Sequence, residues 1–207
     1  MELKNTKINF LGDSITEGAG ASIYENCYVE VLKREFSLAE ARNYGIGGTR
    51  LAKQRIPSAE PKFDRDFPSR VCEMDGDADL VVVFGGTNDH GHGDAPFGQD
   101  SDRTPDTFIG ACHYLYASLK EKFSCPIVVL TPLHRAEEDR ADGITLEDYV
   151  NQIRKIAPQY GLPVLDLYEN SAINRDTLAA LTGDGLHPND EGHAILAREI
   201  GEYLLKL

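Results

Sequence analysis

Cysteine is scarce in this chain, which has four in 207 residues, all far apart in the sequence. No C-x-x-C pair occurs, and no cysteine has a position that argues for catalysis. A chain of this length buries a full core without cross-links, so we expect reduced thiols rather than a disulfide framework or a cysteine-based metal site. The four are Cys27, Cys72, Cys112 and Cys125.

Basic residues are also in the minority: 21 Lys and Arg stand against 34 Asp and Glu, which makes the formal net charge -13. A surface this negative repels phosphate backbones and anionic lipid. We therefore expect neither nucleic acid nor a membrane surface as a partner. Strongly anionic substrates are disfavoured for the same reason, unless the site itself is locally basic.

Long hydrophobic runs are missing as well. No segment approaches the roughly 18 consecutive apolar residues of a membrane span. The N-terminus, MELKNTKINFLGDS, lacks the apolar region and small-residue cleavage site of a secretory signal, so we expect a cytoplasmic protein. No internal repeat, low-complexity tract or linker occurs, and residues 1–207 are expected to form a single domain.

Short apolar runs do occur, and they alternate with helical patterns. The runs are rich in β-branched residues and bounded by Gly, Pro or Asp, which predicts buried strands. Such alternation predicts an α/β fold: a three-layer α/β/α sandwich with a central, mostly parallel sheet of about five strands. The expected strands are Lys7 to Leu11, Asp79 to Phe84, Pro126 to Leu130 and Pro163 to Leu167, with a weaker one at Ala39 to Asn43; the expected helices cover about 24–36, 104–123, 145–160 and 188–205.

Sites in open parallel sheets form at the carboxyl ends of the strands. The segments expected there are GDSITEG, NYGIGGTR, GGTNDHGHG and TPLHR, and DGLHPND comes just before the last helix. Each has an ordinary structural interpretation when taken alone. Ser14 or Thr16 could cap a helix, Gly48 could provide a turn with positive φ, and Asn88 with Asp89 could form an Asx turn.

Taken together, these segments predict acyl-transfer chemistry. A serine hydroxyl such as that of Ser14 is a poor nucleophile until a base accepts its proton, and that base must be held in one tautomer. Asp184 and His187 are three residues apart, so the carboxylate can accept from one ring nitrogen while the other faces the serine. The backbone N–H groups of Ser14 and Gly48 and the side-chain amide of Asn88 are candidate donors to an oxyanion.

GDSITEG, the Gly of NYGIGGTR, GGTND and DGLHPN resemble, in this order, the four sequence blocks of the SGNH hydrolases, also called GDSL esterases and lipases. The resemblance extends from Phe10 to His193. It implies a flavodoxin-like fold, with Ser14 as nucleophile, His187 as base, Asp184 as its partner, and Gly48 with Asn88 completing the oxyanion hole. No G-x-S-x-G elbow occurs, which argues against the α/β-hydrolase arrangement.

Further residues around these segments have weaker candidate roles. His90 and His92, with Asp89 and Asp94, could bind a metal, but no compact third ligand is evident, so we expect no metal and no cofactor. His134, Arg135 and His90 are possible substrate contacts. We expect Asp13 and Asp89 to fasten loops to backbone groups, and His193 to pack within the last helix. The polar stretch from His90 to Arg103 is expected to be irregular and to lie over the site.

Three functions remain open. The first is an esterase that removes short acyl groups, such as acetyl, from a small-molecule or carbohydrate ester. The second is a lysophospholipase or thioesterase acting on longer acyl chains. The third is a binding module for a small ligand such as a flavin, which would leave the coincidence of Ser14, Asp184 and His187 unexplained. Oligomeric state has no signature in the sequence.

Overall fold

The computed structural model describes all 207 residues and is built around one sheet of five parallel strands in the order β2-β1-β3-β4-β5. This order confirms the expected α/β fold and is that of flavodoxin-like proteins. From β1 the chain adds β2 on one side and then β3, β4 and β5 on the other, so the strand order switches direction between β1 and β3. A crevice forms at such a switch point, outside the carboxyl ends of these two strands. The strands are β1 Lys7–Gly12, β2 Glu40–Gly45, β3 Leu80–Phe84, β4 Ile127–Leu130 and β5 Val164–Leu165.

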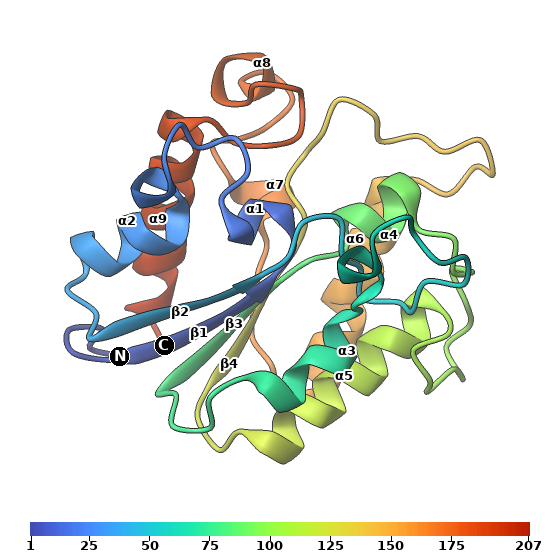
Figure 1. The fold of residues 1–207 in the computed structure, drawn as a ribbon, viewed down its shortest axis with the longest axis horizontal. Helices are drawn as coiled ribbons and strands as arrows, with labels where there is room; N and C mark the ends of the chain where they lie inside the picture. The colour runs from blue at the N-terminus through green and yellow to red at the C-terminus, as the bar shows by residue number, and fades with distance from the viewer.

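Helices cover both faces of this sheet, which completes the three layers (Figure 1). One face carries α1 Ser14–Glu17, α2 Tyr28–Glu35 and α9 Asp190–Leu204, and the other α3 Phe67–Arg70, α5 Phe108–Lys122 and α6 Leu146–Ile156. No helix is long and apolar enough to cross a membrane. The shorter elements are α4 Thr87–His92, α7 Leu167–Asn170 and α8 Leu178–Leu181, with 3-10 turns η1 Tyr24–Asn26, η2 Pro61–Asp64, η3 Val71–Glu73 and η4 Ala157–Tyr160.

Alternating side chains of the strands divide the interior into two cores. On β3, Leu80, Val82 and Phe84 join the core under α2 and α9. Val81 and Val83 point the other way, into the core under α5. Successive side chains of a strand point to opposite faces, and a sheet covered on both faces must be apolar on both. This explains why the apolar runs of the sequence are continuous and not alternating.

Three long helices start later than their patterns predict, and their caps explain why. Thr107 and Thr145 are N-caps of α5 and α6, accepting hydrogen bonds from the backbone N–H groups of Gly110 and Asp148. The last helix, expected to begin at about residue 188, begins at Asp190, because Asn189 is its N-cap and Pro188 precedes the cap. These side-chain oxygens satisfy N–H groups that have no partner within the helix.

Other segments also differ from the expectation. The stretch from His90 to Arg103 is not wholly irregular, because α4 continues to His92 from an N-cap at Gly86. Asn88 and Asp89 therefore lie in a helix and not in an Asx turn. Strand β5 has only two residues, since Asp166 caps α7 immediately after it. The short helices between residues 61 and 73 were not expected at all.

Candidate active site

Ser14 lies at the carboxyl end of the central strand β1, as the first residue of α1. Asp13 is the N-cap of this helix, and its carboxylate accepts a hydrogen bond from the backbone N–H of Ile15 at 3.0 Å. A Cβ on Gly12 would lie 1.9 Å from Oγ1 of Thr16, so only glycine allows so sharp a turn from strand to helix. The N–H of Ser14, in the first turn, has no acceptor within the helix.

His187 connects Ser14 to Asp184 through a continuous line of hydrogen bonds. Nε2 of His187 lies 2.9 Å from Oγ of Ser14, and Nδ1 lies 2.7 Å from Oδ2 of Asp184. A carboxylate only accepts, so Nδ1 carries the proton and Nε2 of the neutral ring accepts from the serine hydroxyl. The other carboxylate oxygen, Oδ1, accepts from the backbone N–H of His187 at 2.8 Å, which fixes the three-residue loop.

The charge of Asp184 is maintained by these contacts. Partial burial raises the pKa of its carboxyl, but hydrogen bonds from the backbone and ring of His187 outweigh this effect, and the pKa lies below its usual range. The loop is held at its two ends by a bridge between Thr182 and Pro188. Asp184 is thus an ionised acceptor that orients the imidazole.

Gly48 and Asn88 approach the same cavity from the second and third strands. Gly48 has φ +72°, and its N–H donates no hydrogen bond to the protein. Asn88 is 3% exposed, and its Nδ2 donates to the carbonyl of Thr49 at 3.0 Å, which leaves the second amide hydrogen free. Since Ser14, Gly48 and Asn88 line one cavity with His187, three N–H donors without protein acceptors are available there.

Asp89 fastens the Gly48 loop to α4, as expected. Its carboxylate oxygens accept from the backbone N–H groups of Leu51 and Ala52 at 2.9 and 2.8 Å. Burial raises the pKa of Asp89 to about 7, against these hydrogen bonds, which lower it. Asp13 is buried as well, and its pKa is raised to about 6 for the same reason.

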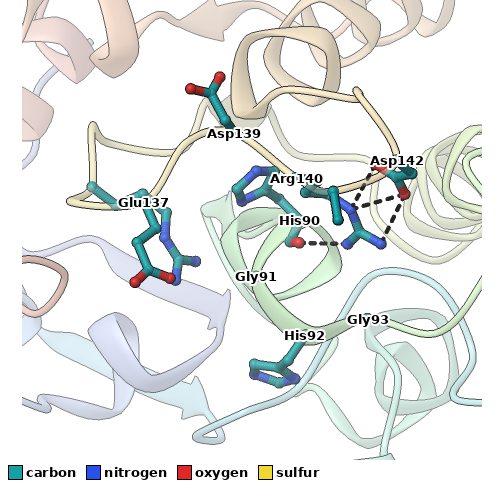
Figure 2. A pocket seen from close by; sticks show the side chains of 10 residues that line it. His90, Gly91, His92, Gly93, Glu137, Asp139, Arg140 and Asp142 are labelled. Atoms are coloured by element: carbon teal, nitrogen blue, oxygen red, sulfur yellow. Dashed lines mark hydrogen bonds and ion pairs between the residues drawn. The ribbon is translucent and has the colours of Figure 1, made fainter.

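His92 has a place in the site that the sequence did not reveal. Its Nε2 lies 3.2 Å from Oδ1 of Asn88, four residues earlier on α4, and the ring lines the cavity of Ser14. His90 points to a different side of the same helix (Figure 2). The spacing of four residues is the usual signal for neighbours on one helix face, but it is informative only once α4 is known to be a helix.

The cavity that contains Ser14 has a volume of about 560 Å³. Two of its 11 lining residues are hydrophobic. Two lining residues, Ser58 and Phe63, come from outside the segments that the sequence singled out, and Arg50 and Leu186 lie within those segments but had no role assigned to them. The full lining is Ser14, Gly47, Gly48, Arg50, Ser58, Phe63, Asn88, His92, Arg135, Leu186 and His187.

Of the three candidates for substrate contact, only Arg135 lines this cavity. His90 is 2% exposed, and its Nε2 lies 2.9 Å from the carbonyl oxygen of Glu138. It borders an adjacent cavity of about 410 Å³, where Arg140 bonds the carbonyl of His90 and the carboxylate of Asp142 (Figure 2). The helical turn of α4 directs His90 there and away from Ser14.

His134 is also outside the cavity of Ser14. Its Nδ1 lies 2.6 Å from Oε1 of Glu138, and its ring centroid is 4.0 Å from that of Tyr168. Hydrogen bonds from His134, Tyr168 and Arg175 to Glu138 hold the pKa of that carboxyl below its usual range, although burial raises it. These contacts place His134 in the packing of the loop after β4.

The possible metal ligands are used in other ways. Asp89 binds backbone N–H groups as described, and Asp94 accepts from the backbone N–H groups of Arg55 and Ile56 at 2.8 and 2.6 Å. His90 and His92 point apart, and no group of three or more His, Cys, Asp or Glu side chains is placed to hold a metal ion. His193 is buried, and its Nδ1 accepts from the backbone N–H of Tyr28 at 3.2 Å. The four cysteines are free thiols.

Comparisons with known proteins identify the family and the fold. The model of the GDSL-like lipase/acylhydrolase family matches residues 10–195. A solved structure of a protein from Lactobacillus plantarum is similar at 27% identity, with a TM-score of 0.85 and 98% of each chain covered. A lipase/acylhydrolase from Enterococcus faecalis is similar at 25% identity and TM-score 0.66, covering 96% of this chain and 95% of that one.

An acetyl xylan esterase shares the fold at 23% identity, with a TM-score of 0.62 and coverage of 96% of this chain and 99% of that one. No curated protein matches the sequence significantly. The family model covers nearly the whole chain, including all four sequence blocks. The chain therefore belongs to the GDSL-like lipase/acylhydrolase family and is a serine hydrolase.

Proposed function

We propose that this protein is an esterase that removes short acyl groups, such as acetyl, from a polar or carbohydrate alcohol through an acyl-enzyme. Ser14 is the nucleophile, His187 the general base and Asp184 its orienting partner. The observation that carries the proposal is the unbroken contact from Oγ of Ser14 through His187 to Asp184, at 2.9 and 2.7 Å. An alcohol placed in this way is activated for attack on an acyl carbon.

In the first half-reaction, Oγ of Ser14 bonds to the acyl carbon while its proton passes to Nε2 of His187. The carbonyl electrons move to oxygen, and the oxyanion accepts from the N–H groups of Ser14, Gly48 and Asn88. The carbon–oxygen bond to the alcohol then breaks, and Nε2 returns the proton to the leaving oxygen. Water repeats the sequence on the acyl-enzyme, releasing the carboxylic acid and restoring Ser14.

The preference for a short acyl group and a polar alcohol rests on the lining of the cavity. Only Phe63 and Leu186 among the 11 lining residues are hydrophobic. A long acyl chain needs a continuous apolar groove, whereas polar side chains suit a hydroxyl-rich alcohol. No observation favours the binding-module alternative, because binding alone does not explain why Ser14, His187 and Asp184 are aligned by hydrogen bonds.

The central test combines covalent labelling with a substitution. A fluorophosphonate should label the protein on Ser14, and Ser14→Ala should abolish both the label and the hydrolysis of 4-nitrophenyl acetate. Ser58→Ala is the matched control, because Ser58 lines the same cavity but donates its hydroxyl hydrogen to Asp64 at 2.5 Å. Labelling of the Ser14→Ala variant, or its loss in the Ser58→Ala variant alone, would overturn the assignment of the nucleophile.

A further inference from the structure

The cavity of Ser14 differs in charge from the rest of the molecule. The chain has a formal net charge of -13, yet the lining includes Arg50 and Arg135 and contains no Asp or Glu. His92 and His187 also line it, and both rings can only add positive charge. A locally basic site on an acidic protein is the one condition under which an anionic substrate is favoured.

Arg50 is fixed beside the loop that carries Gly48. It is 4% exposed, and its Nη1 donates to the carbonyls of Gly48 and Phe63 at 3.1 and 3.0 Å. Both acceptors are neutral, no carboxylate lies within 4.0 Å, and the buried Nε has no partner at all. Nη2 makes no hydrogen bond to the protein, so the guanidinium retains an unused donor at the cavity wall.

Arg135 reaches the cavity from the opposite side, on the loop after β4. Its Nη1 donates to the carbonyl of Thr87 at 3.0 Å, directly before Asn88, and its buried Nε has no partner. Like Arg50, it makes no ion pair. Burial lowers the pKa of both guanidinium groups, and its effect exceeds the opposite effect of carboxylates that lie farther away.

Several carboxylates close to the cavity accept hydrogen bonds from other groups. Glu17 accepts from the backbone N–H of Gly47, a lining residue, at 2.8 Å. Asp64 accepts from the backbone N–H and the hydroxyl of Ser58, and Asp89 accepts from two backbone N–H groups. Asp184 is engaged by the ring and backbone N–H of His187. Two arginines whose guanidinium groups keep N–H donors without protein acceptors therefore line one cavity, and none of its lining residues is a carboxylate.

We propose that the ester hydrolysed at Ser14 carries an anionic group, a carboxylate, sulfate or phosphate, which Arg50 and Arg135 bind in this cavity. The proposal rests on the esterase function and names its substrate class. Arginine presents forked N–H donors that match the oxygens of such anions, and charge-assisted hydrogen bonds are about twice as strong as neutral ones. A neutral sugar hydroxyl would leave both charges uncompensated.

The test uses two pairs of esters, each made of an ionised carboxylate and its neutral methyl ester. For the alcohol side, the pair is 4-acetoxybenzoate and its methyl ester. For the acyl side, it is mono-4-nitrophenyl glutarate and its methyl ester, with uncatalysed hydrolysis subtracted. We expect kcat/KM for the ionised member to exceed that for the neutral one by about tenfold or more in one pair, and the ratio to fall as salt is added.

Substitutions test whether the guanidinium of Arg135 causes the preference for the ionised ester. Arg135→Gln should lower the ionised-to-neutral ratio by roughly tenfold, and Arg135→Lys should retain part of it because the charge remains. Lys120→Gln is the matched control, since it removes one positive charge from an exposed position near the end of α5, by the amino edge of the sheet. It should leave the ratio unchanged.

The possible outcomes distinguish failure of the anionic-substrate proposal from failure of the proposed esterase function. Hydrolysis of none of the four esters would contradict the esterase function itself. Hydrolysis with a ratio of one or less in both pairs would overturn the anionic substrate and leave the serine mechanism intact. A ratio that responds equally to Arg135→Gln and to Lys120→Gln would attribute the preference to the overall field of the protein and not to the cavity.

Discussion

Nε2 of His92 lies 3.2 Å from Oδ1 of Asn88, one turn away on the same helix. The carbonyl oxygen of an amide only accepts, so Nε2 of His92 carries a hydrogen. Burial and the neighbouring Arg50 lower the pKa of His92, which keeps the ring neutral. The bond from Nδ2 to the carbonyl of Thr49 assigns the two ends of the Asn88 amide, and the contact with His92 holds the amide in that orientation.

The first prediction concerns this amide. Asn88→Ala should lower kcat by about a hundredfold or more with little change in KM, because the donor acts mainly when charge develops on the acyl oxygen. Steady-state kinetics with 4-nitrophenyl acetate measure the two constants separately. An effect confined to KM would assign Asn88 to ground-state binding.

A second prediction follows for His92 as a positioning residue. His92→Leu should lower kcat by roughly tenfold, since the amide is then free to rotate, and His92→Gln should restore part of the loss by donating to Oδ1. In the Asn88→Ala background, His92→Leu should have almost no further effect. Additive losses in the double variant would show that His92 acts independently of Asn88.

The third prediction concerns the base. His187→Ala should lower kcat/KM by about a thousandfold or more, and Asp184→Asn by less, because the ring remains when its partner is weakened. Asp184, with a pKa below its usual range, stays ionised above about pH 5. A general base must be unprotonated to accept the serine proton, so kcat/KM should rise as the pH is raised from acid. A flat profile with chemistry rate-limiting would count against His187.

The fourth prediction links pH to stability. Burial raises the folded-state pKa of Asp89 to about 7 and that of Asp13 to about 6, both above the ordinary value of 3.8 for an aspartate. The native state then binds more protons than the unfolded state between about pH 4 and 7, so stability falls as pH rises through this window. Thermal unfolding should give a higher Tm at pH 5 than at pH 8. Asp89→Asn should reduce that difference; an equal difference in the variant would exclude Asp89 as its source.

The fifth prediction concerns acyl length. With two hydrophobic side chains around the cavity, kcat/KM should fall steeply from acetyl and butyryl to octanoyl and longer 4-nitrophenyl esters. Acetylated sugars should be accepted. A preference for decanoyl or palmitoyl esters, or for lysophospholipid, would favour the long-chain alternative while leaving the serine mechanism standing.

Local patterns were enough to locate the central strands and the Asp184–His187 pair. The run through β3 is apolar at every position because both faces of the sheet are covered. This pattern can be recognised in the sequence without knowledge of the tertiary structure. The three-residue spacing of Asp184 and His187 lets one loop form their hydrogen bond by itself. The carboxyl-edge rule then places Ser14 and Asn88 on neighbouring strands.

The surroundings of Ser14 depended on the tertiary structure. Arg50, Ser58 and Phe63 reach the cavity from the stretch between β2 and β3, which has no periodic pattern and is held by hydrogen bonds such as those to Asp64 and Asp89. Whether His90 or His92 faces Ser14 depended on a short helix, α4, which starts from an N-cap at Gly86. Sequence by itself determined the chemistry of the strand ends; the packing of irregular segments decided the charge and shape of the cavity around them.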